Sequence, residues 1–285
     1  MLPRLGRLLS PLALVALVAG CAQVMDRGKS PLARPTMSPD SVALEIFFVR
    51  VRFGDEQANG ALWEEIDEQR FDTALRRRLA ESGFRLGLVP TQVPVPLQQL
   101  LQVSGQPVSP EEETVVNLLE DSPVTRRVLQ ARSGHRSLVP CSGIYETLPL
   151  LSIDEGRVAG KTYPKAQAML ALKAFPQGDG RVRLELLPEL HYGEVRQTWV
   201  GSQGAFRLDA GQSKKVFEEL AMTHTLASGE MLLLTNLPGR PGSLGHHFFT
   251  HRTGDTLEQK LLLVRILQTQ FNDLFGPELL EVPEE

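Results

Sequence analysis

Apolar and polar residues alternate along residues 42–53, VALEIFFVRVRF. Alternation with a period of two places successive side chains on opposite faces of a strand, so this segment is predicted to be a β-strand. The apolar positions change parity near Phe47 and Phe48, which a β-bulge would explain. A second strand is predicted at residues 84–89, FRLGLV.

Helical spacing separates these two strands. Apolar residues four positions apart predict helical structure from Ala61 to about Ser82. Asp72 is placed to cap a second helix within this stretch, and Gly83 is placed to end it. The order of strand, helix and strand predicts a small α/β module at residues 41–103.

The remainder of the chain has the pattern of a β protein. Residues 104–123 contain three prolines and an acidic run, and they are predicted to be a linker. Short apolar segments separated by turn residues then predict a mainly antiparallel β domain at residues 124–275, followed by an acidic tail at 276–285. The fold class is therefore predicted to be α+β. The candidate strands are 124–131, 136–141, 146–153, 168–175, 181–187, 231–237 and 260–270. Residues 213–222 have the spacing of a short helix.

The clearest hairpin is predicted at residues 168–187. Val182, Leu184 and Leu186 alternate with charged residues directly after the turn sequence PQGDG. These three side chains are therefore predicted to face the core, while Arg183 and its charged neighbours face water or an adjacent subunit.

The first 21 residues, MLPRLGRLLSPLALVALVAGC, have the order of a secretory signal. Two arginines precede an apolar run at residues 8–19, which is shorter than the roughly 20 residues that cross a bilayer. The run ends in Val18-Ala19-Gly20-Cys21, which resembles the lipobox of bacterial lipoproteins. The resemblance implies that residues 1–20 are a cleaved signal peptide and that Cys21 carries lipid. The proline-containing residues 21–40 are then predicted to be a flexible tether.

The lipobox-like sequence also predicts where in the cell the protein is located. It implies a lipid-anchored protein of the bacterial cell envelope whose contact with the membrane is the lipid on Cys21. Ala22 follows the cysteine where an Asp would suggest retention at the inner membrane, so the outer membrane facing the periplasm is predicted. The formal net charge of −4 gives no support for a nucleic-acid partner.

Few residues suggest chemistry. Cys141 is predicted to be a buried small residue, because no motif supplies a base that would activate it. The sequence GHHFFTHR holds His246, His247 and His251, but adjacent histidines on a strand point apart, and Gly245 and the residues after His247 do not favour a helix. We predict no catalytic, cofactor-binding or metal-binding residue, no cofactor and no enzymatic activity.

Four segments of residues 124–270 resemble the C-terminal domain of bacterial secretins. Secretins are the outer-membrane ring proteins of type II and type III secretion and of pilus systems. The segments are VLQARSGHRSLVPCSGIYETLPLL, AMLALKAFPQGDGRVRLELLPEL, THTLASGEMLLLTNL and EQKLLLVRILQTQ. The first two are similar to secretin hairpins, the third to a strand pair around a Gly-containing turn, and the fourth to the closing strand. The sequence PGSLG before Phe248 is similar to the Pro-x-Leu-Gly-x-Phe region of the family.

The resemblance has two departures, which predict a degenerate domain. Thr235-Asn236 stands where secretins have Gly-Gly, and Leu267-Gln268 stands where they have Thr-Pro. The resemblance implies a non-enzymatic lipoprotein that acts as a structural or assembly component, with a second copy or a secretion-system protein as partner. The alternative is a monomeric periplasmic lipoprotein that binds a small ligand or a peptide. A ring protein pairs its edge strands with neighbours, whereas a monomer must protect them.

Overall fold

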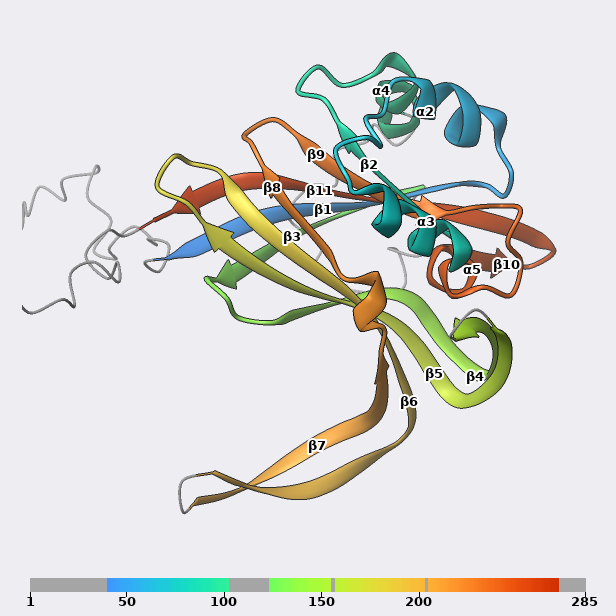
Figure 1. The fold of residues 1–285 in the computed structure, drawn as a ribbon, viewed down its shortest axis with the longest axis vertical. Helices are drawn as coiled ribbons and strands as arrows, with labels where there is room; N and C mark the ends of the chain where they lie inside the picture. The colour runs from blue at the N-terminus through green and yellow to red at the C-terminus, as the bar shows by residue number, and fades with distance from the viewer. Residues whose placement is uncertain (1–39, 103–122, 155–156, 203–204, 272–285) are drawn as a thin grey trace, which may run out of the picture. The chain divides into compact units, whose positions relative to one another are not determined.

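The computed structural model describes residues 40–102, 123–154, 157–202 and 205–271, with the backbone alone at 152–158 and 196–210 within these ranges. The described residues all belong to a single unit (Figure 1). The predicted signal peptide, the tether, the acidic tail and nearly all of the predicted linker lie outside the described residues. The fold class is α+β, and the strand pairs of the two sheets are antiparallel, as predicted.

The first sheet, called sheet A below, has the strand order β2-β9-β11-β1-β3, and β10 pairs with β11 beside this path. Its strands are β1 (Ser41–Arg52), β2 (Phe84–Val89), β3 (Val124–Arg132), β9 (Met231–Asn236), β10 (Thr250–Thr253) and β11 (Thr256–Gln270). Here the predicted domain division is wrong. β1 and β2 come from the predicted α/β module, yet β1 lies between β3 and β11 and β2 pairs with β9, so residues 41–103 share one sheet with the β domain.

The second sheet, called sheet B, has the order β4-β5-β6-β7, with β8 paired to β6. Its strands are β4 (Ser137–Asp154), β5 (Arg157–Pro176), β6 (Val182–Ser202), β7 (Ala205–Val216) and β8 (Met222–Leu226). The predicted hairpin is confirmed, because β5 and β6 pair from Pro176 opposite Val182 onward. Val182, Leu184 and Leu186 are buried in the core, as alternation requires.

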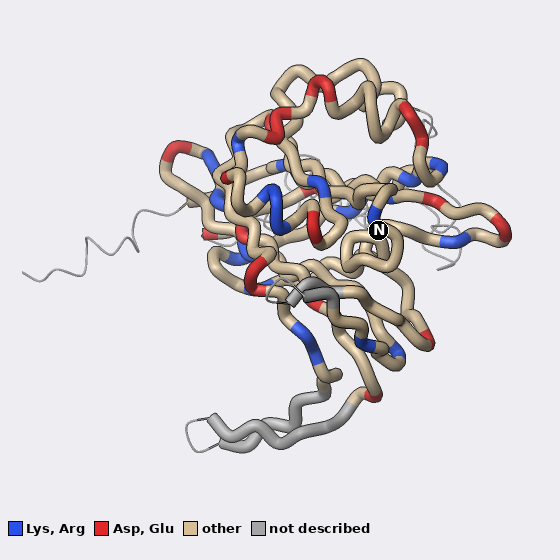
Figure 2. The backbone as a smooth tube through the Cα atoms, turned by 45° about the vertical axis from the view of Figure 1, so that its right-hand side comes forward, with Lys and Arg blue, Asp and Glu red and all other residues tan. Residues whose placement is uncertain are grey.

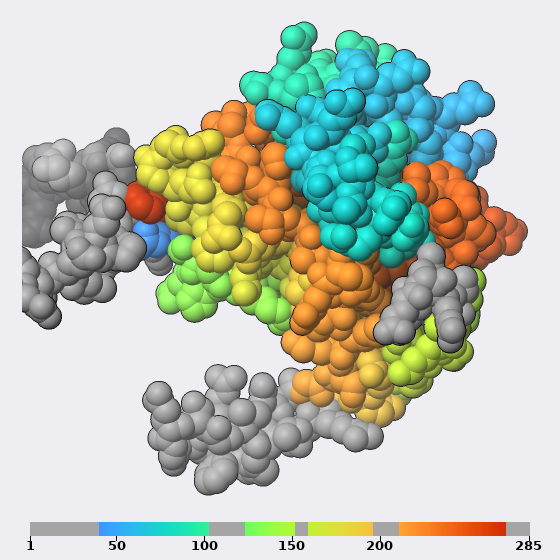
Figure 3. Space-filling model, in the orientation of Figure 1, coloured from blue at the N-terminus to red at the C-terminus, as the bar shows by residue number. Residues whose placement is uncertain are grey.

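The helical segments of the described chain are η1 (Gln57–Ala61), α2 (Leu62–Glu64), α3 (Thr73–Glu81), α4 (Val95–Gln102), η2 (Glu218–Leu220) and α5 (Leu244–Phe249). η1, α2 and α4 form a helical layer on one face of sheet A, where Leu62, Trp63 and Leu97 pack with Leu233 and Leu263. Leu79 of α3, Leu220 of η2 and Phe248 of α5 belong instead to the core between the sheets. The blue and teal segments that carry most of these helices cover one side of the unit (Figure 3). The opposite face of sheet A packs against sheet B through a larger apolar core.

Burial on both faces explains why the central strands of sheet A carry long apolar runs in place of strict alternation. Every residue of β9, MLLLTN, is buried, and a strand covered on both sides is a continuous apolar run rather than an alternating one. The same cause explains β1, where the bulge predicted near Phe47 and Phe48 is absent. Phe48 packs in the core between the sheets and Phe47 in the core under the helices. The irregularity in the pairing of β1 with β11 lies instead between Ala43 and Leu44.

The ends of α3 are set by the two residues predicted to set them. The Asp72 carboxylate accepts hydrogen bonds from the backbone N–H groups of Ala74 (2.8 Å) and Leu75 (3.1 Å). Gly83 follows the helix with a φ of 81°, a left-handed conformation that glycine adopts without a steric cost. The helical structure predicted from Ala61 to about Ser82 is interrupted, because α2 ends at Glu64 and α3 begins only at Thr73.

Two local predictions about helices are wrong. Residues 244–249 form α5, because the Ser243 hydroxyl caps the backbone N–H of His246 (3.3 Å) and Gly245 allows close contact with the turn between α3 and β2. A Cβ on Gly245 would lie 2.1 Å from the carbonyl oxygen of Gly83. In residues 213–222, by contrast, β7 continues to Val216, and only the short turn η2 is helical.

The resemblance to a secretin strand pair at residues 223–237 is also corrected. β8 pairs with β6 in sheet B, whereas β9 pairs with β2 and β11 in sheet A. The turn between them therefore carries the chain from one sheet to the other. It does not close a hairpin.

Candidate assembly surface and buried polar sites

Sheet B divides into two arms. β5 and β6 pair from Pro176–Val182 as far as Gln167–His191. Beyond that point, in the described chain, β5 pairs only with β4 and β6 only with β7. We call residues 144–154 with 157–167 the β4–β5 arm, and residues 193–202 with 205–212 the β6–β7 arm. Figure 1 shows the two hairpins diverging from the shared part of the sheet.

Backbone geometry at the base of the arms produces the division. Gly193 has a φ of 81°, and the register of β6 with β7 shifts between Tyr192 and Arg196. A glycine in this conformation is typical of a bulge that bends a strand. The rings of Tyr163 and Tyr192 stack edge to face at the fork, with centroids 4.8 Å apart. Nearby, Lys165 forms an ion pair with Glu194, and this hydrogen bond and charge raise the pKa of Lys165.

The β4–β5 arm is covered along part of its outer edge. The backbone N–H of Leu151 donates to the carbonyl of Gly242 (3.1 Å). His247 Nε2 lies 2.9 Å from the carbonyl oxygen of Pro149, and the Tyr145 hydroxyl donates to the carbonyl of His247 (2.9 Å). α5 and the loop before it therefore occupy hydrogen-bonding groups on this edge, and Pro149 itself has no N–H to offer a neighbour.

The β6–β7 arm has no such cover within the described residues. Residues 196–202 pair with 205–211, and no further strand pairs with either member over this length. Its outer backbone groups are therefore edges that a neighbouring strand could pair with. Val195 at its base has 62% of its surface exposed. The arm is the candidate assembly surface.

A buried carboxylate occupies the outer face of sheet B. Glu189 is 1% exposed and lines a cavity of about 350 Å³ together with Arg136 and Lys214. Its carboxylate accepts a hydrogen bond from Arg136 and lies 2.8 Å from His191 Nε2. Burial alone would raise the pKa of Glu189, but the hydrogen bonds from His191 and Arg136 outweigh it and lower the pKa. The group is thus a paired anion, and this arrangement is that of a structural ion pair.

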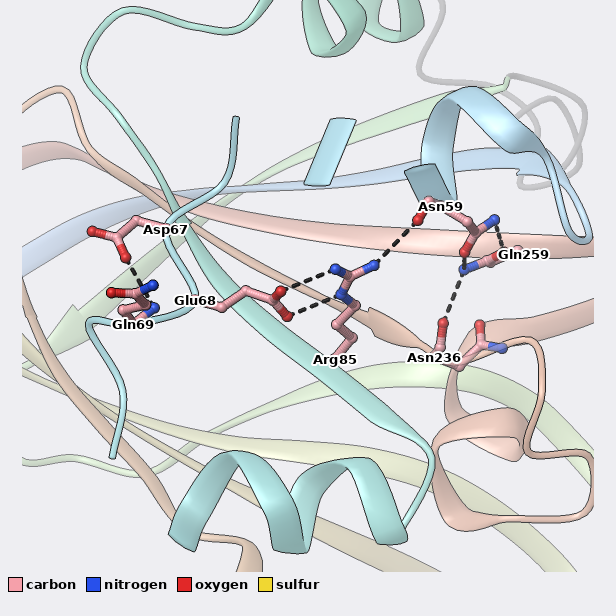
Figure 4. A network of polar contacts seen from close by, with 7 residues as sticks. All are labelled: Asn59, Asp67, Glu68, Gln69, Arg85, Asn236 and Gln259. Atoms are coloured by element: carbon pink, nitrogen blue, oxygen red, sulfur yellow. Dashed lines mark hydrogen bonds and ion pairs between the residues drawn. The ribbon is translucent and has the colours of Figure 1, made fainter. Parts of the chain in front are cut away.

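A second polar network lies between sheet A and η1 (Figure 4). The buried Gln259 amide donates to Asn59 Oδ1 (2.9 Å), to the Thr235 hydroxyl (3.1 Å) and to the carbonyl of Asn236 (3.0 Å). Thr235 in turn donates to the carbonyl of Lys260 (2.8 Å). Thr235 and Asn236 thus supply a side-chain partner and a backbone partner to a buried glutamine.

Next to this network, Arg85 joins the helical layer to β2. It forms two hydrogen bonds of 2.9 Å with the carboxylate of Glu68, and a third of 3.1 Å with the carbonyl of Asn59. Its guanidinium lies 4.1 Å from the centre of the Trp63 ring. The bidentate pair and the stacking fix the position of the segment between α2 and α3.

The residues singled out in the sequence do not form one site. Cys21 lies outside the described residues. Cys141 is buried, as predicted, and burial raises the pKa of its thiol to about 12, so it is protonated at neutral pH. His246 and His247 lie on α5, and His251 is exposed on β10. The described residues hold no group of three His, Cys, Asp or Glu side chains arranged for a metal ion, and none of their helices is long and apolar enough to cross a membrane.

The apolar pattern of the sequence does not predict the division of sheet B or the strand β7. A glycine inside an alternating segment is a signal of a bulge, and Gly193 in the sequence HYGEV supplied it. The charge distribution does not locate a binding surface, because basic and acidic residues are interspersed over the described chain (Figure 2). The site is therefore defined by strand edges and buried pairs rather than by a cluster of reactive groups.

Comparisons with known proteins identify no family for this chain. No protein-family model matches the chain, and no curated protein matches it significantly. Among solved structures it is similar to the type II secretin GspD from enteropathogenic Escherichia coli, with 12% sequence identity and a TM-score of 0.20. The match covers 80% of this chain and 66% of the secretin chain, which is less than two thirds of that chain's length. A similarity this weak supports no conclusion about function. The fold places the chain in the class of antiparallel α+β proteins with two packed sheets.

Proposed function

We propose that the chain is a non-enzymatic lipoprotein of the bacterial envelope that acts as a structural or assembly component. Lipid on Cys21 would anchor it to the outer membrane, with residues 38–285 in the periplasm. The sequence Val18-Ala19-Gly20-Cys21 after an apolar run supports the anchor. The β6–β7 arm supports the assembly role.

The physical reason lies in the unpaired edges of the arm. A two-stranded hairpin without further packing is only marginally stable in water. Pairing with another strand satisfies its outer N–H and C=O groups and extends the sheet. We propose that a second copy of the chain is this neighbour, since each copy carries the same unpaired edges. A single observation carries the proposal, namely that the β6–β7 arm pairs only with itself in the described chain.

Site-specific photo-cross-linking in membranes tests this assembly role. A photoreactive amino acid at Val195, at the base of the arm, should give an adduct of twice the chain mass on irradiation. The same residue at Val95 on α4 is the matched control, because the two valines are 62% and 61% exposed. We expect no dimer adduct from position 95. Adducts of equal yield at both positions, or none at position 195, would contradict the proposal.

A further inference from the structure

A second cavity, of about 320 Å³, lies between the two sheets and has no part in the proposed assembly. One side is formed by β1, β3, β10 and β11 of sheet A, and the other by β4 and β5 of sheet B. Its volume is within the range of pockets that hold small molecules. It is open to solvent at one side, where Arg127 is exposed.

A bulge in β4 opens this cavity. Pro140 is paired with Met169, but the next pair joins Ile144 to Gln167, so β4 holds two more residues than β5 over this interval. The extra residues are fixed by side-chain bonds. The Ser142 hydroxyl accepts from the backbone N–H of Ala168 (2.9 Å), and its carbonyl accepts from Gln167 Nε2 (3.0 Å). The wall of the cavity is therefore a defined structure.

Among the described residues, the charged side chains that line the cavity are all basic. They are Arg50, Arg127 and Lys260, and His251 also contributes to the lining. In the described part of the chain, the carboxylate of Glu258 lies 3.7 Å from Arg50 and interacts electrostatically with Lys260. Three cations against this carboxylate leave an excess of positive charge among the described residues of a partly enclosed site, where Coulomb interactions are stronger than in water.

Lys260 is a half-buried cation whose ammonium group is held at the bulge. Its ammonium group donates to the carbonyl of Cys141 at the bulge, and an ammonium group has three N–H donors. Burial lowers the pKa of Lys260, which shows that its surroundings disfavour the charged form. An anion beside the ammonium group would reverse this penalty.

We propose that the cavity between the sheets binds a small anion carrying a phosphate group, held by Lys260, Arg50 and Arg127. A phosphate dianion has the charge that balances the excess of the lining. Guanidinium groups bind phosphate oxygens through paired N–H donors, and lysine contributes a point charge. The apolar side chains of Phe48 and Pro140 complete the wall and leave room for the carbon skeleton of a phosphate monoester. This inference does not depend on the assembly role, and it agrees with the alternative of a ligand-binding lipoprotein.

Calorimetric titration of the detergent-solubilised full chain tests the site. Inorganic phosphate and glycerol 3-phosphate are the probes, with sodium chloride at matched ionic strength as the reference for general salt effects. We expect saturable binding of at least one phosphate probe to the wild type, and none of chloride. Binding of inorganic phosphate would identify free phosphate as sufficient, and binding of glycerol 3-phosphate alone would identify a monoester, the chemistry of a lipid headgroup or a phosphorylated metabolite.

Substitutions then locate the binding. Lys260→Met and Arg127→Gln should each weaken the affinity at least tenfold. Arg127 is exposed, so its variant remains informative if Lys260→Met does not fold. Arg252→Gln is the matched control, because Arg252 is an exposed neighbour of His251 that does not line the cavity. We expect an affinity within twofold of the wild type for this control. No binding by the wild type, equal heats with chloride, or unchanged affinity in both lining variants would overturn the proposal.

Discussion

At the scale of single residues, consecutive residues of β6 differ sharply in burial. Leu184 is buried in the core between the sheets, whereas the side chain of Arg183 is 40% exposed, pairs with Glu185 and lies over the ring of Phe175. Leu184→Asp would bury an unpaired charge and should lower the free energy of unfolding by at least about 3 kcal/mol. Arg183→Asp should lower it by no more than about 1 to 2 kcal/mol. Urea unfolding measures both, and equal losses would mean that the hairpin register is wrong.

Residues whose role depends on local pattern were predictable, and those with distant partners were not. Alternation was enough to assign Leu184 to the core, and spacing alone identified the cap at Asp72. The buried Glu45 shows the limit. Its carboxylate pairs with Arg126 and Arg265, which are 81 and 220 residues away in the sequence. Nothing in the residues around Glu45 indicates either partner, because both meet it only when β1 is placed between β3 and β11.

At the scale of elements, the docking of α5 depends on one glycine. A Cβ at Gly245 would clash with backbone atoms of Gly83 and Phe84, which cannot move away as a flexible side chain would. Gly245→Ala should therefore lower the free energy of unfolding by about 2 kcal/mol. Gly60→Ala is the control, since a Cβ there meets nothing within 4 Å and η1 is helical. Chemical denaturation should show no loss for Gly60→Ala, and a similar loss in both variants would contradict the docking.

Because α5 carries two partly buried histidines, we expect the folded chain to lose stability in acid. Burial lowers the pKa of His246 and of His247, and the neighbouring His246 lowers that of His247 further. The folded chain therefore binds fewer protons than the unfolded chain once the pH falls below the unfolded value of about 6.5. The contribution of the two buried, neutral histidines to the free energy of unfolding is therefore complete above about pH 6.5. It is lost as the pH falls toward their lowered pKa values in the folded chain.

Unfolding measured between pH 7 and pH 5 checks this prediction. The free energy of unfolding of the wild type should decrease over this interval. The double variant His246→Gln/His247→Gln should show a smaller decrease, whereas substitution of the exposed His135 by Gln should leave the slope as in the wild type. Parallel slopes for the wild type and the double variant would mean that α5 is not buried as described.

The element patterns also show why the architecture was only partly predictable. Strand positions follow from apolar segments, and eight strands of the described chain overlap predicted ones. Which strands pair does not follow, because pairing depends on the order in space. The segments at β8 and β9 suggested a hairpin by their proximity in sequence, yet each belongs to a different sheet. α5 was missed because its contact with Gly83 outweighs the weak helix propensity of its sequence.

At the scale of the whole molecule, the proposed localisation of the protein depends on its first 21 residues. Cys21→Ser removes the sulfur to which lipid would attach. The variant should move from the membrane pellet to the soluble periplasmic fraction on cell fractionation, because the proposed anchor is then lost. Ser142→Ala, which leaves Cys21 in place, is the control and should remain in the pellet. A Cys21→Ser protein that still sediments with unchanged efficiency would mean that the anchor lies elsewhere.

The central claim is that copies of this chain associate through the β6–β7 arm. The most direct measurement is the mass of the detergent-extracted protein by light scattering, for the wild type and for a variant in which residues 193–212 are replaced by Asn-Gly. Tyr192 and Ser213 are paired, so this replacement closes the strands with a two-residue turn and removes the arm. We predict a wild-type mass of two or more chains, a variant mass of one chain, and similar melting temperatures for both. A wild-type mass of one chain, or a variant mass equal to that of the wild type, would contradict the claim.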